Sequence, residues 1–294
     1  MKAALLADRG VVKVAGDGAR NFLHGLVTAD ILELTPGTAR FCALLTPQGK
    51  IVADFIVTEA PAKDGGGLFL DVQRALCVTL VAKLNIYKLR AKVIVEDLSA
   101  VLGVLAAWDG SGAVKRDTTK LGLSYADPRL PALGFRVMLP PHLAAAAAAG
   151  LDATPVDAGQ YEAHRIALGV PQGGLDFSYG DAFPHETDMD QLGGVDFTKG
   201  CYVGQEVVSR MHHRGEPRKR IVRLALGGDA PEQGTPVLAG EMPVGTLGST
   251  SGRAALALLR LDRVEDASAA GKALSAGGIA VKLAPATGEK FSFS

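Results

Sequence analysis

The chain has 294 residues, of which 48% are hydrophobic, and its 31 basic side chains balance 31 acidic ones. This length allows two or three packed units, and the neutral charge argues against direct binding of nucleic acid, which needs clustered positive charge. No apolar run approaches the roughly 20 residues of a membrane span, so we expect a soluble protein with no membrane partner.

The N-terminal stretch MKAALLADRGVV lacks the long apolar region and the cleavage site of a secretory signal. We therefore expect a cytoplasmic protein, or a mitochondrial matrix protein if the chain is a processed eukaryotic form. Cys42, Cys77 and Cys201 are far apart and form no CxxC pair. This spacing predicts neither a disulfide framework nor a self-contained metal or cluster site.

The first part of the chain predicts a strand, a helix and a hairpin. Residues 11–16 alternate like a strand, and Asp17 is placed to cap a helix through residues 19–31. Two strand-like runs flank the turn TPQG at 46–49. Asp54 lies in the second run, where a buried carboxylate needs a partner because an unpaired buried charge is costly.

Strands and helices then alternate. A helix is predicted over residues 74–89 and a strand over 90–99, within an α+β unit that spans roughly 45–140. A second helix is predicted within 155–170, capped by Asp157 and ended by Gly169.

The C-terminal half contains a long irregular stretch and a β-rich end. Residues 171–196 are rich in Gly, Asp and Phe, which is typical of a functional loop. A helix follows over 203–214, and after Pro217 short strands between Gly and Pro turns predict a small β-barrel. The basic cluster HHRGEPRKR at 212–220 is either a solvated linker or a contact for an anion or a partner.

The stretch FTKGCYVGQEVV at 197–208 contains one cysteine, Cys201, for which two roles are possible. If a helix begins at Tyr202 or Val203, the thiol of Cys201 lies at the positive helix end, and Lys199 would further favour the thiolate. The alternative is a small buried residue at a crowded turn. A cysteine protease would need a histidine partner, and none of the six histidines carries a recognisable signature.

Acidic residues offer a second kind of site. Glu186 lies in the segment AFPHETDMD, and together with Asp54 it could accept the paired N–H donors of a pterin or guanine ring. Asp188 and Asp190 suggest a hard cation, but the segment lacks a calcium-loop pattern. We therefore expect no metal site.

Four segments together carry a family resemblance: FLHGLVTADI, CALLTPQGKIVADFIV, YKLRAKV and KGCYVGQEVVSRMHHRG. In this order they resemble the YgfZ family, the folate-dependent factors of iron–sulfur protein maturation. The family motif K-G-C-Y-x-G-Q-E is matched by Lys199, Gly200, Cys201, Tyr202, Gly204, Gln205 and Glu206.

The resemblance implies a fold similar to aminomethyltransferase, the T-protein of the glycine cleavage system. That fold is α+β, with three domains in a cloverleaf around a central tetrahydrofolate pocket. It implies a discontinuous first domain (1–45 plus 141–215), an inserted α+β domain (46–140) and a C-terminal β-barrel (216–294).

The resemblance also implies site residues. Asp54 matches the catalytic, folate-contacting aspartate of the T-protein strand, and Glu186 in FPHE matches the glutamate that holds the pterin. Glu162, Arg165 and Asp71 are further candidates for the folate site. The T-protein lacks the KGCYVGQE segment, which argues against assigning aminomethyl transfer on Asp54 alone.

Two functions follow from the resemblance. The first is an accessory factor that binds tetrahydrofolate and supports assembly or repair of iron–sulfur clusters in client or scaffold proteins through Cys201, with a link to tRNA modification. Lys199, Tyr202, Gln205 and Glu206 would complete that reactive motif. The second is a folate-dependent one-carbon transferase with Asp54 as acid or base. No heptad pattern indicates a dimer, so we expect a monomer.

Overall fold

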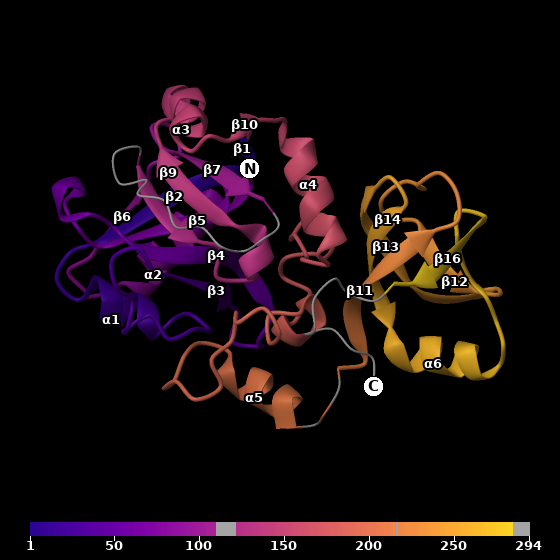
Figure 1. Ribbon diagram of the computed structural model, residues 1–294. Helices are drawn as coiled ribbons and strands as arrows, with labels where there is room; N and C mark the ends of the chain where they lie inside the picture. Colours follow the sequence, from indigo (N-terminus) through magenta and orange to yellow (C-terminus); the bar gives the residue numbers. More distant parts are fainter. Residues whose placement is uncertain (110–121, 214, 216, 285–294) are drawn as a thin grey trace. The chain divides into compact units, whose positions relative to one another are not determined.

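The computed structural model describes residues 1–109, 122–213, 215 and 217–284. The chain forms two compact units, each made of two chain segments (Figure 1). Unit 1 contains Met1–Tyr161 and Leu192–Gln205, and unit 2 contains Glu162–Gln191 and Glu206–Ser294. In the part of the chain that the structure describes, no helix is both long and apolar enough to cross a membrane.

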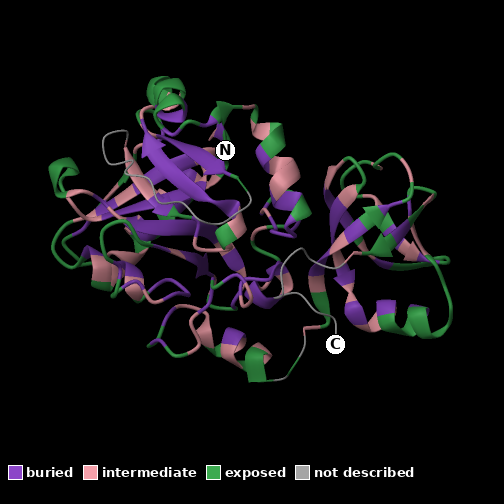
Figure 2. Cartoon of the chain, in the orientation of Figure 1, coloured by how far each residue is buried: buried purple, intermediate pink, exposed green. Residues whose placement is uncertain are grey.

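Unit 1 is built on two five-stranded sheets. The first is antiparallel throughout, with the spatial order β3 (Ala39–Leu45), β4 (Ile51–Glu59), β5 (Leu68–Gln73), β2 (Arg9–Ala15) and β6 (Ile94–Asp97). The second has the order β10 (Thr154–Pro155), β1 (Lys2–Leu6), β7 (Gly103–Trp108), β9 (Phe135–Leu139) and β8 (Leu123–Ala126). Most of these strands are buried along their length (Figure 2).

Among its described residues, the first long segment of unit 1 also contains three helices that lie wholly within it and four short 3-10 turns. The helices are α1 (Ala19–His24), α2 (Cys77–Tyr87) and α3 (Ala144–Gly150). The 3-10 turns are η1 (Ala62–Asp64), η2 (Arg74–Leu76), η3 (Pro131–Leu133) and η4 (Pro141–Leu143). Helix α2 packs on β2 and β6 through Leu80 and Leu84, which belong to the apolar core of the first sheet.

Unit 2 is a closed barrel with an irregular segment attached to it. The barrel order is β11 (Lys219–Leu226), β14 (Ala254–Arg260), β13 (Met242–Ser251), β12 (Pro236–Ala239), β15 (Leu274–Ala276) and β16 (Ile279–Leu283), and β16 closes on β11. Helix α6 (Leu261–Ala269) buries Leu261, Val264 and Ala267 in the barrel core.

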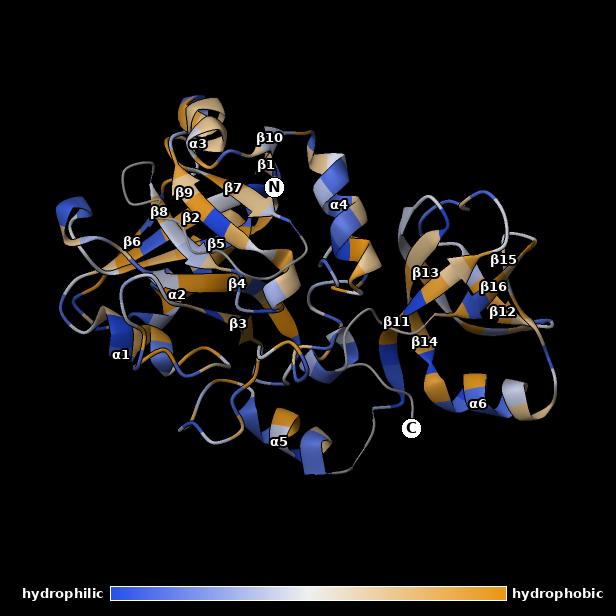
Figure 3. Ribbon diagram, in the orientation of Figure 1, coloured by the Kyte–Doolittle hydropathy of each residue, from blue (hydrophilic) through white to orange (hydrophobic). Residues whose placement is uncertain are grey.

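Two helices begin in unit 1 and continue into unit 2. They are α4 (Ala158–Ala167) and α5 (Gln205–His213), and each carries a hydrophilic side with apolar residues at helical spacing (Figure 3). The short turn η5 (Pro184–Thr187) lies in the otherwise irregular segment between them.

Several predicted elements are confirmed. The β3–β4 hairpin closes at TPQG, where Thr46 N–H donates to the Lys50 carbonyl at 2.8 Å and Gly49 has a φ of +82°. Asp157 Oδ1 accepts from Gln160 N–H at 3.2 Å at the start of α4, and Gly169 follows that helix with a φ of +76°. The C-terminal β-barrel is confirmed as well, although helix α6 was not predicted.

One helix cap and two helix boundaries were predicted wrongly. Gly18, not Asp17, precedes α1, with a φ of +83° and no side-chain cap. The helix also ends at His24 instead of continuing to residue 31, because the chain turns to pair Thr28 with Ala43 of β3. The helix after the KGCY segment begins at Gln205, not at residue 202 or 203.

Candidate functional site

The KGCY segment belongs to unit 1, where it is fastened to the loop between α1 and β3. Asp196 N–H donates to the Thr28 carbonyl at 2.9 Å, and Thr28 Oγ1 donates to the Gly194 carbonyl at 2.5 Å. The same Thr28 hydroxyl accepts from Ala43 N–H at 2.9 Å. One buried threonine therefore ties the late segment to the first sheet.

Lys199 is the second fastening point, and its ammonium points away from solvent. The side chain is 7% exposed, and Nζ donates to the carbonyls of His24 at 2.7 Å, Val27 at 2.6 Å and Ala29 at 3.1 Å. Burial lowers the pKa of Lys199, although Cys42, Asp30 and Asp196 act against this. The sequence suggested that this charge activates Cys201, but the structure directs the ammonium to three backbone carbonyls.

Tyr202 and Gly204 fix the chain on the other side of the cysteine. The Tyr202 ring is buried with its centroid 5.2 Å from Lys199 Nζ, and burial raises the pKa of its phenol to about 12. Gly204 has a φ of +83°, and a Cβ there would lie 2.5 Å from the Thr46 carbonyl oxygen. Only glycine lets this segment approach the TPQG hairpin so closely.

Cys201 lies exposed between these fixed points, next to the exposed Gly200. Of the three cysteines, all within the described residues, Cys42 and Cys77 are buried and Cys201 is exposed. Burial raises the pKa of both other thiols, and Cys77 Sγ lies 3.2 Å from Ser99 Oγ. The thiolate is the reactive form of cysteine, so Cys201 is the thiol that a partner or reagent can reach. Because α5 starts four residues later, the predicted helix N-terminus does not act on it.

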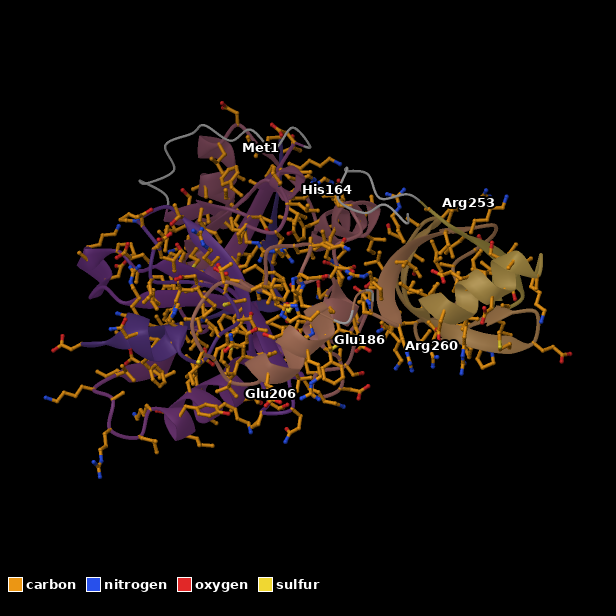
Figure 4. The ribbon with its side chains drawn as sticks, turned by 90° about the horizontal axis from the view of Figure 1, so that it is seen from below. Met1, His164, Glu186, Glu206, Arg253 and Arg260 are labelled. Carbon is orange, nitrogen blue, oxygen red and sulfur yellow. The ribbon has the colours of Figure 1, made fainter. Side chains whose placement is uncertain are left out.

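The remaining motif residues lie at the start of α5. Gln205 N–H reaches the Tyr202 carbonyl at 3.3 Å. Glu206 is exposed and forms an ion pair with Arg210 one turn later at 2.7 Å. Figure 4 labels Glu206 on α5 and Glu186 on η5.

Asp54 lies in β4 of unit 1, opposite Ala43 of β3, and is 9% exposed. It lies within electrostatic range of Arg9, whose pKa it helps to raise against the effect of burial. The strand position predicted for Asp54 is therefore confirmed, and its charge is buried near a guanidinium.

Asp71 is fully engaged inside unit 1. Its Oδ1 accepts from Arg9 Nε at 2.6 Å, and its Oδ2 accepts from Arg136 Nη1 at 2.5 Å and from Tyr125 Oη at 3.0 Å. Burial would raise the pKa of Asp71, but Arg9 and Arg136 hold it below its usual range. Its carboxylate joins strand β5 to β8 and β9 of the second sheet, so the predicted folate contact of Asp71 would compete with these bonds.

The same network continues through a second buried aspartate. Arg136 Nε also donates to Asp127 Oδ2 at 3.0 Å, and its Nη2 donates to Tyr161 Oη at 3.0 Å. Arg129 forms a two-bond pair with Asp127, at 2.9 and 2.7 Å. A buried charge network of this kind depends on every partner being present.

Unit 2 contains the other predicted folate residues, and Arg165 is as fully bonded there as Asp71 is in unit 1. The guanidinium is 1% exposed and donates to Glu162, Asp176, the Val170 carbonyl and Ser249 Oγ. This residue fastens α4 to strand β13, which disfavours a ligand-binding role. Glu162 is part-exposed and pairs with it at 2.7 Å.

Glu186 lies on η5, where its Oε2 accepts from Phe183 N–H at 3.0 Å. Two residues later Asp188 adopts a φ of +60° and its Oδ1 accepts from Arg220 Nη1 at 2.7 Å. Asp190 binds the same guanidinium through both oxygens, at 3.2 and 2.9 Å. The Arg220 guanidinium thus binds the two carboxylates, Asp188 and Asp190, that the sequence suggested for a hard cation. Burial raises the pKa of Asp188 to about 8, although Arg220 opposes it.

Comparison with known proteins gives the fold first. A crystal structure of the glycine cleavage system aminomethyltransferase T from Bartonella henselae matches 100% of this chain and 88% of its own, with a TM-score of 0.76 and 18% identity. Residues 218–287 match the family model described as "CAF17, C-terminal beta-barrel domain". The predicted aminomethyltransferase fold with a C-terminal β-barrel is therefore confirmed.

Sequence relatives give the family. The mouse protein named "Iron-sulfur cluster assembly factor IBA57, mitochondrial" is 30% identical over 284 residues, which cover 88% of this chain and 78% of the relative. The chain belongs to the IBA57 family. A fungal IBA57 homolog from Mycosarcoma maydis is 39% identical over 239 residues, which cover 76% of this chain and 57% of the relative.

The family that the relatives show is IBA57, and the resemblance of the KGCY motif to the YgfZ family is consistent with it. The likeness to aminomethyltransferase is a likeness of fold. The chain spans a little over half the length of the fungal relative. The names of both relatives include the word mitochondrial, which agrees with the matrix alternative of the predicted location.

Sequence reasoning missed Thr28, His24 and Asp196 as parts of this site. Asp196 Oδ1 accepts from Thr198 N–H at 2.8 Å and from Lys199 N–H at 3.1 Å, which shapes the turn before the cysteine. His24 Nδ1 lies 3.4 Å from Asp30 Oδ1, and burial and Lys199 lower the pKa of its imidazole. A signal existed, because His24 and Thr28 lie inside the segment FLHGLVTADI that carries the resemblance.

Proposed function

We propose that the chain is an assembly factor for iron–sulfur proteins and that Cys201 is the thiol that contacts the cluster or its client. The exposed position of Cys201 within an otherwise fastened segment carries this proposal. A thiol held between Lys199 and Tyr202 is presented at a fixed place on unit 1, which reduces the ordering needed when a partner binds. The names of the IBA57 relatives support the same role.

One thiolate cannot hold a cluster alone, because common clusters use about four protein ligands. Within the described residues, the other two cysteines are buried in unit 1, and no group of three His, Cys, Asp or Glu side chains is arranged to hold a metal ion. The proposal therefore requires a client or scaffold protein to supply the remaining ligands. Cys201 would act as a shared ligand or as a transient thiol during transfer.

Tetrahydrofolate is the proposed small-molecule ligand, and the donor set fits it in part. Asp54 and Glu186 have the carboxylate chemistry that the amide and amino edge of a pterin requires. Asp71 and Arg165 do not fit, since their polar atoms already bind side chains and carbonyls of the chain itself. The remaining candidate folate residues are Asp54 in unit 1 and, considered separately, Glu186 and the weaker candidate Glu162 in unit 2.

The decisive experiment is complementation of a deletion strain followed by assays of several iron–sulfur enzymes. Wild type should restore these activities, and Cys201→Ser should not. Cys77→Ala removes a buried thiol in the same unit and serves as the matched control, provided that both variants fold like wild type by circular dichroism. Full restoration by Cys201→Ser would refute the thiol role.

The alternative is folate-dependent one-carbon transfer, which the aminomethyltransferase fold keeps open. It predicts turnover of an aminomethyl donor by the purified protein with tetrahydrofolate. It also predicts that Asp54→Asn abolishes this turnover while Cys201→Ser barely changes it. In the assembly proposal Asp54→Asn weakens tetrahydrofolate binding and the protein has no such turnover.

A further inference from the structure

Helix α2 is apolar on its outer side as well as on its inner side. Cys77, Leu80 and Leu84 face the core of the first sheet. On the outer side Val78 is 75% exposed and Ile86 is 66% exposed. Thr79 and Lys83 of α2 are exposed as well, but exposed apolar side chains grouped on a helix favour contact with another molecule.

The turn that follows α2 presents a third apolar side chain. Leu89 is 89% exposed and has a φ of +41°. Ala91 N–H donates to the Lys88 carbonyl at 2.6 Å and closes this turn around Leu89 and Arg90. The position directly after a helix usually takes glycine when φ is positive, and strained backbone tends to persist where it has a function.

The exposed apolar residues of α2 share one face. Val78, Ala82 and Ile86 follow each other at intervals of four residues. Residues at such intervals lie on the same side of a helix, and Leu89 follows in the turn after it. This is the spacing of anchors by which a helix enters a groove on another protein.

Basic residues predominate around this face, although Glu96 and Asp97 of the adjacent strand β6 are acidic and exposed. Residues 73–95 contain five basic residues and no acidic one, although acidic and basic residues balance over the whole chain. The basic residues are Arg74, Lys83, Lys88, Arg90 and Lys92. A complementary surface must therefore be acidic, since opposed potentials guide docking and like charges exclude wrong partners. This stretch includes YKLRAKV, a resemblance segment to which the proposed function assigns no role.

We propose that α2 and the turn at Leu89 form a docking surface for a protein that offers an apolar groove rimmed by aspartate and glutamate. A protein groove fits better than an anionic membrane, because a rigidly held anchor such as Leu89 gains affinity from a matching pocket. The apolar residues exposed on α2 are also few and aliphatic, whereas membrane-surface helices commonly add aromatic residues to a longer apolar face. This docking role does not depend on the chemistry of Cys201.

The test places a photo-crosslinking benzophenone residue at Leu89 of the full chain in living cells. The matched control carries it at Leu32, another exposed leucine of unit 1 that lies outside α2 and its turn. We expect an adduct with one protein from Leu89 and none from Leu32. Mass spectrometry should find the joined peptide rich in apolar residues and flanked by acidic ones.

The purified pair then tests the chemistry. Ile86→Asp should weaken binding at least about tenfold, and Lys83→Glu should weaken it and reduce its sensitivity to salt. Replacing an acidic residue that flanks the crosslinked peptide of the partner by lysine should restore binding to the Lys83→Glu variant. Lys63→Glu, an exposed lysine of η1, is the control and should bind like wild type.

Leu89→Gly provides a variant that keeps the fold. It relieves the positive φ, so the melting temperature should rise while partner binding falls. A stability gain without a loss of binding would overturn the anchor role of Leu89.

The proposal is also overturned if the adduct joins two copies of this chain, or if no adduct exceeds the Leu32 control. Co-sedimentation with cardiolipin vesicles that Ile86→Asp abolishes would assign the surface to a membrane instead. Thiol reactivity of Cys201 should stay at the wild-type rate in all these variants, which separates this test from that of the proposed function.

Discussion

Replacing Lys199 by methionine tests whether this residue fastens the cysteine segment or activates the thiol. Methionine has a similar length but donates no hydrogen bond, so the carbonyls of His24, Val27 and Ala29 would each lose a donor. A hydrogen bond to a charged group contributes about 1.5–3 kcal/mol. The ammonium is 7% exposed, and the unfavourable burial of its charge offsets part of this gain.

We therefore expect Lys199→Met to lower the free energy of unfolding by about 2–4 kcal/mol, which is less than the three bonds would give together. Urea denaturation followed by circular dichroism measures this loss. Lys63→Met is the matched control, because that lysine is exposed on η1 of the same unit. It should change stability by no more than about 0.5 kcal/mol.

The rate at which Cys201 reacts with a thiol reagent provides the second measurement. If Lys199 only holds the segment in place, the Lys199→Met substitution should loosen the segment around Cys201. The rate at which Cys201 reacts with the thiol reagent should then not fall. A stable Lys199→Met protein whose Cys201 reacts much more slowly would refute the structural reasoning and restore the role suggested by the sequence. Lys199→Arg should not rescue stability, since a planar guanidinium does not fit three carbonyls grouped around a compact ammonium.

Three further predictions concern folding. Asp71→Asn should lower stability by about 3–5 kcal/mol, because it leaves buried arginine charge uncompensated; a smaller loss than an exposed Asp→Asn change would contradict the network. Asp188 has a raised folded pKa of about 8, so it keeps a proton that the unfolded chain has lost, and stability should fall as pH rises from about 4 to 8; Asp188→Asn should flatten this part of the profile in pH-dependent urea titrations. Gly204→Ala should lower the melting temperature, because its Cβ would meet the Thr46 oxygen at 2.5 Å, whereas Gly200→Ala meets nothing within 4 Å and should not.

Local pattern was sufficient for the parts of the fold that depend on neighbours in sequence. The hairpin at TPQG, the start of α4 at Asp157 and its end at Gly169 all follow from residues close to one another. Helix α6 was missed, although Leu261, Val264 and Ala267 recur every three residues. Its first residue directly continues strand β14, so no turn residue separates the two elements.

The sequence predicts which residue types belong to the site, but not which partners their side chains reach. The motif identified Cys201, and alternation placed Asp54 in a strand. The target of Lys199, however, lies about 170 positions earlier in the chain, and Asp71 finds Arg136 on a strand of another sheet. Such partners depend on how distant segments meet, and no local spacing encodes them. For the same reason the sequence does not reveal the bonds of Arg165 to Asp176 and Ser249.

Because unit 1 consists of two separate chain segments, the order of synthesis determines when the unit can be completed. Leu192–Gln205 completes this unit, yet the ribosome makes it only after Glu162–Gln191 of the other unit. Until then Thr28 lacks the Gly194 carbonyl, and the carbonyls that receive Lys199 have no donor. A nascent or prematurely terminated chain that ends before Leu192 therefore lacks the segment that holds Cys201. The cell obtains a presented Cys201 only from a chain that has been translated well past the middle, so truncated products should not compete with the complete protein for its partners.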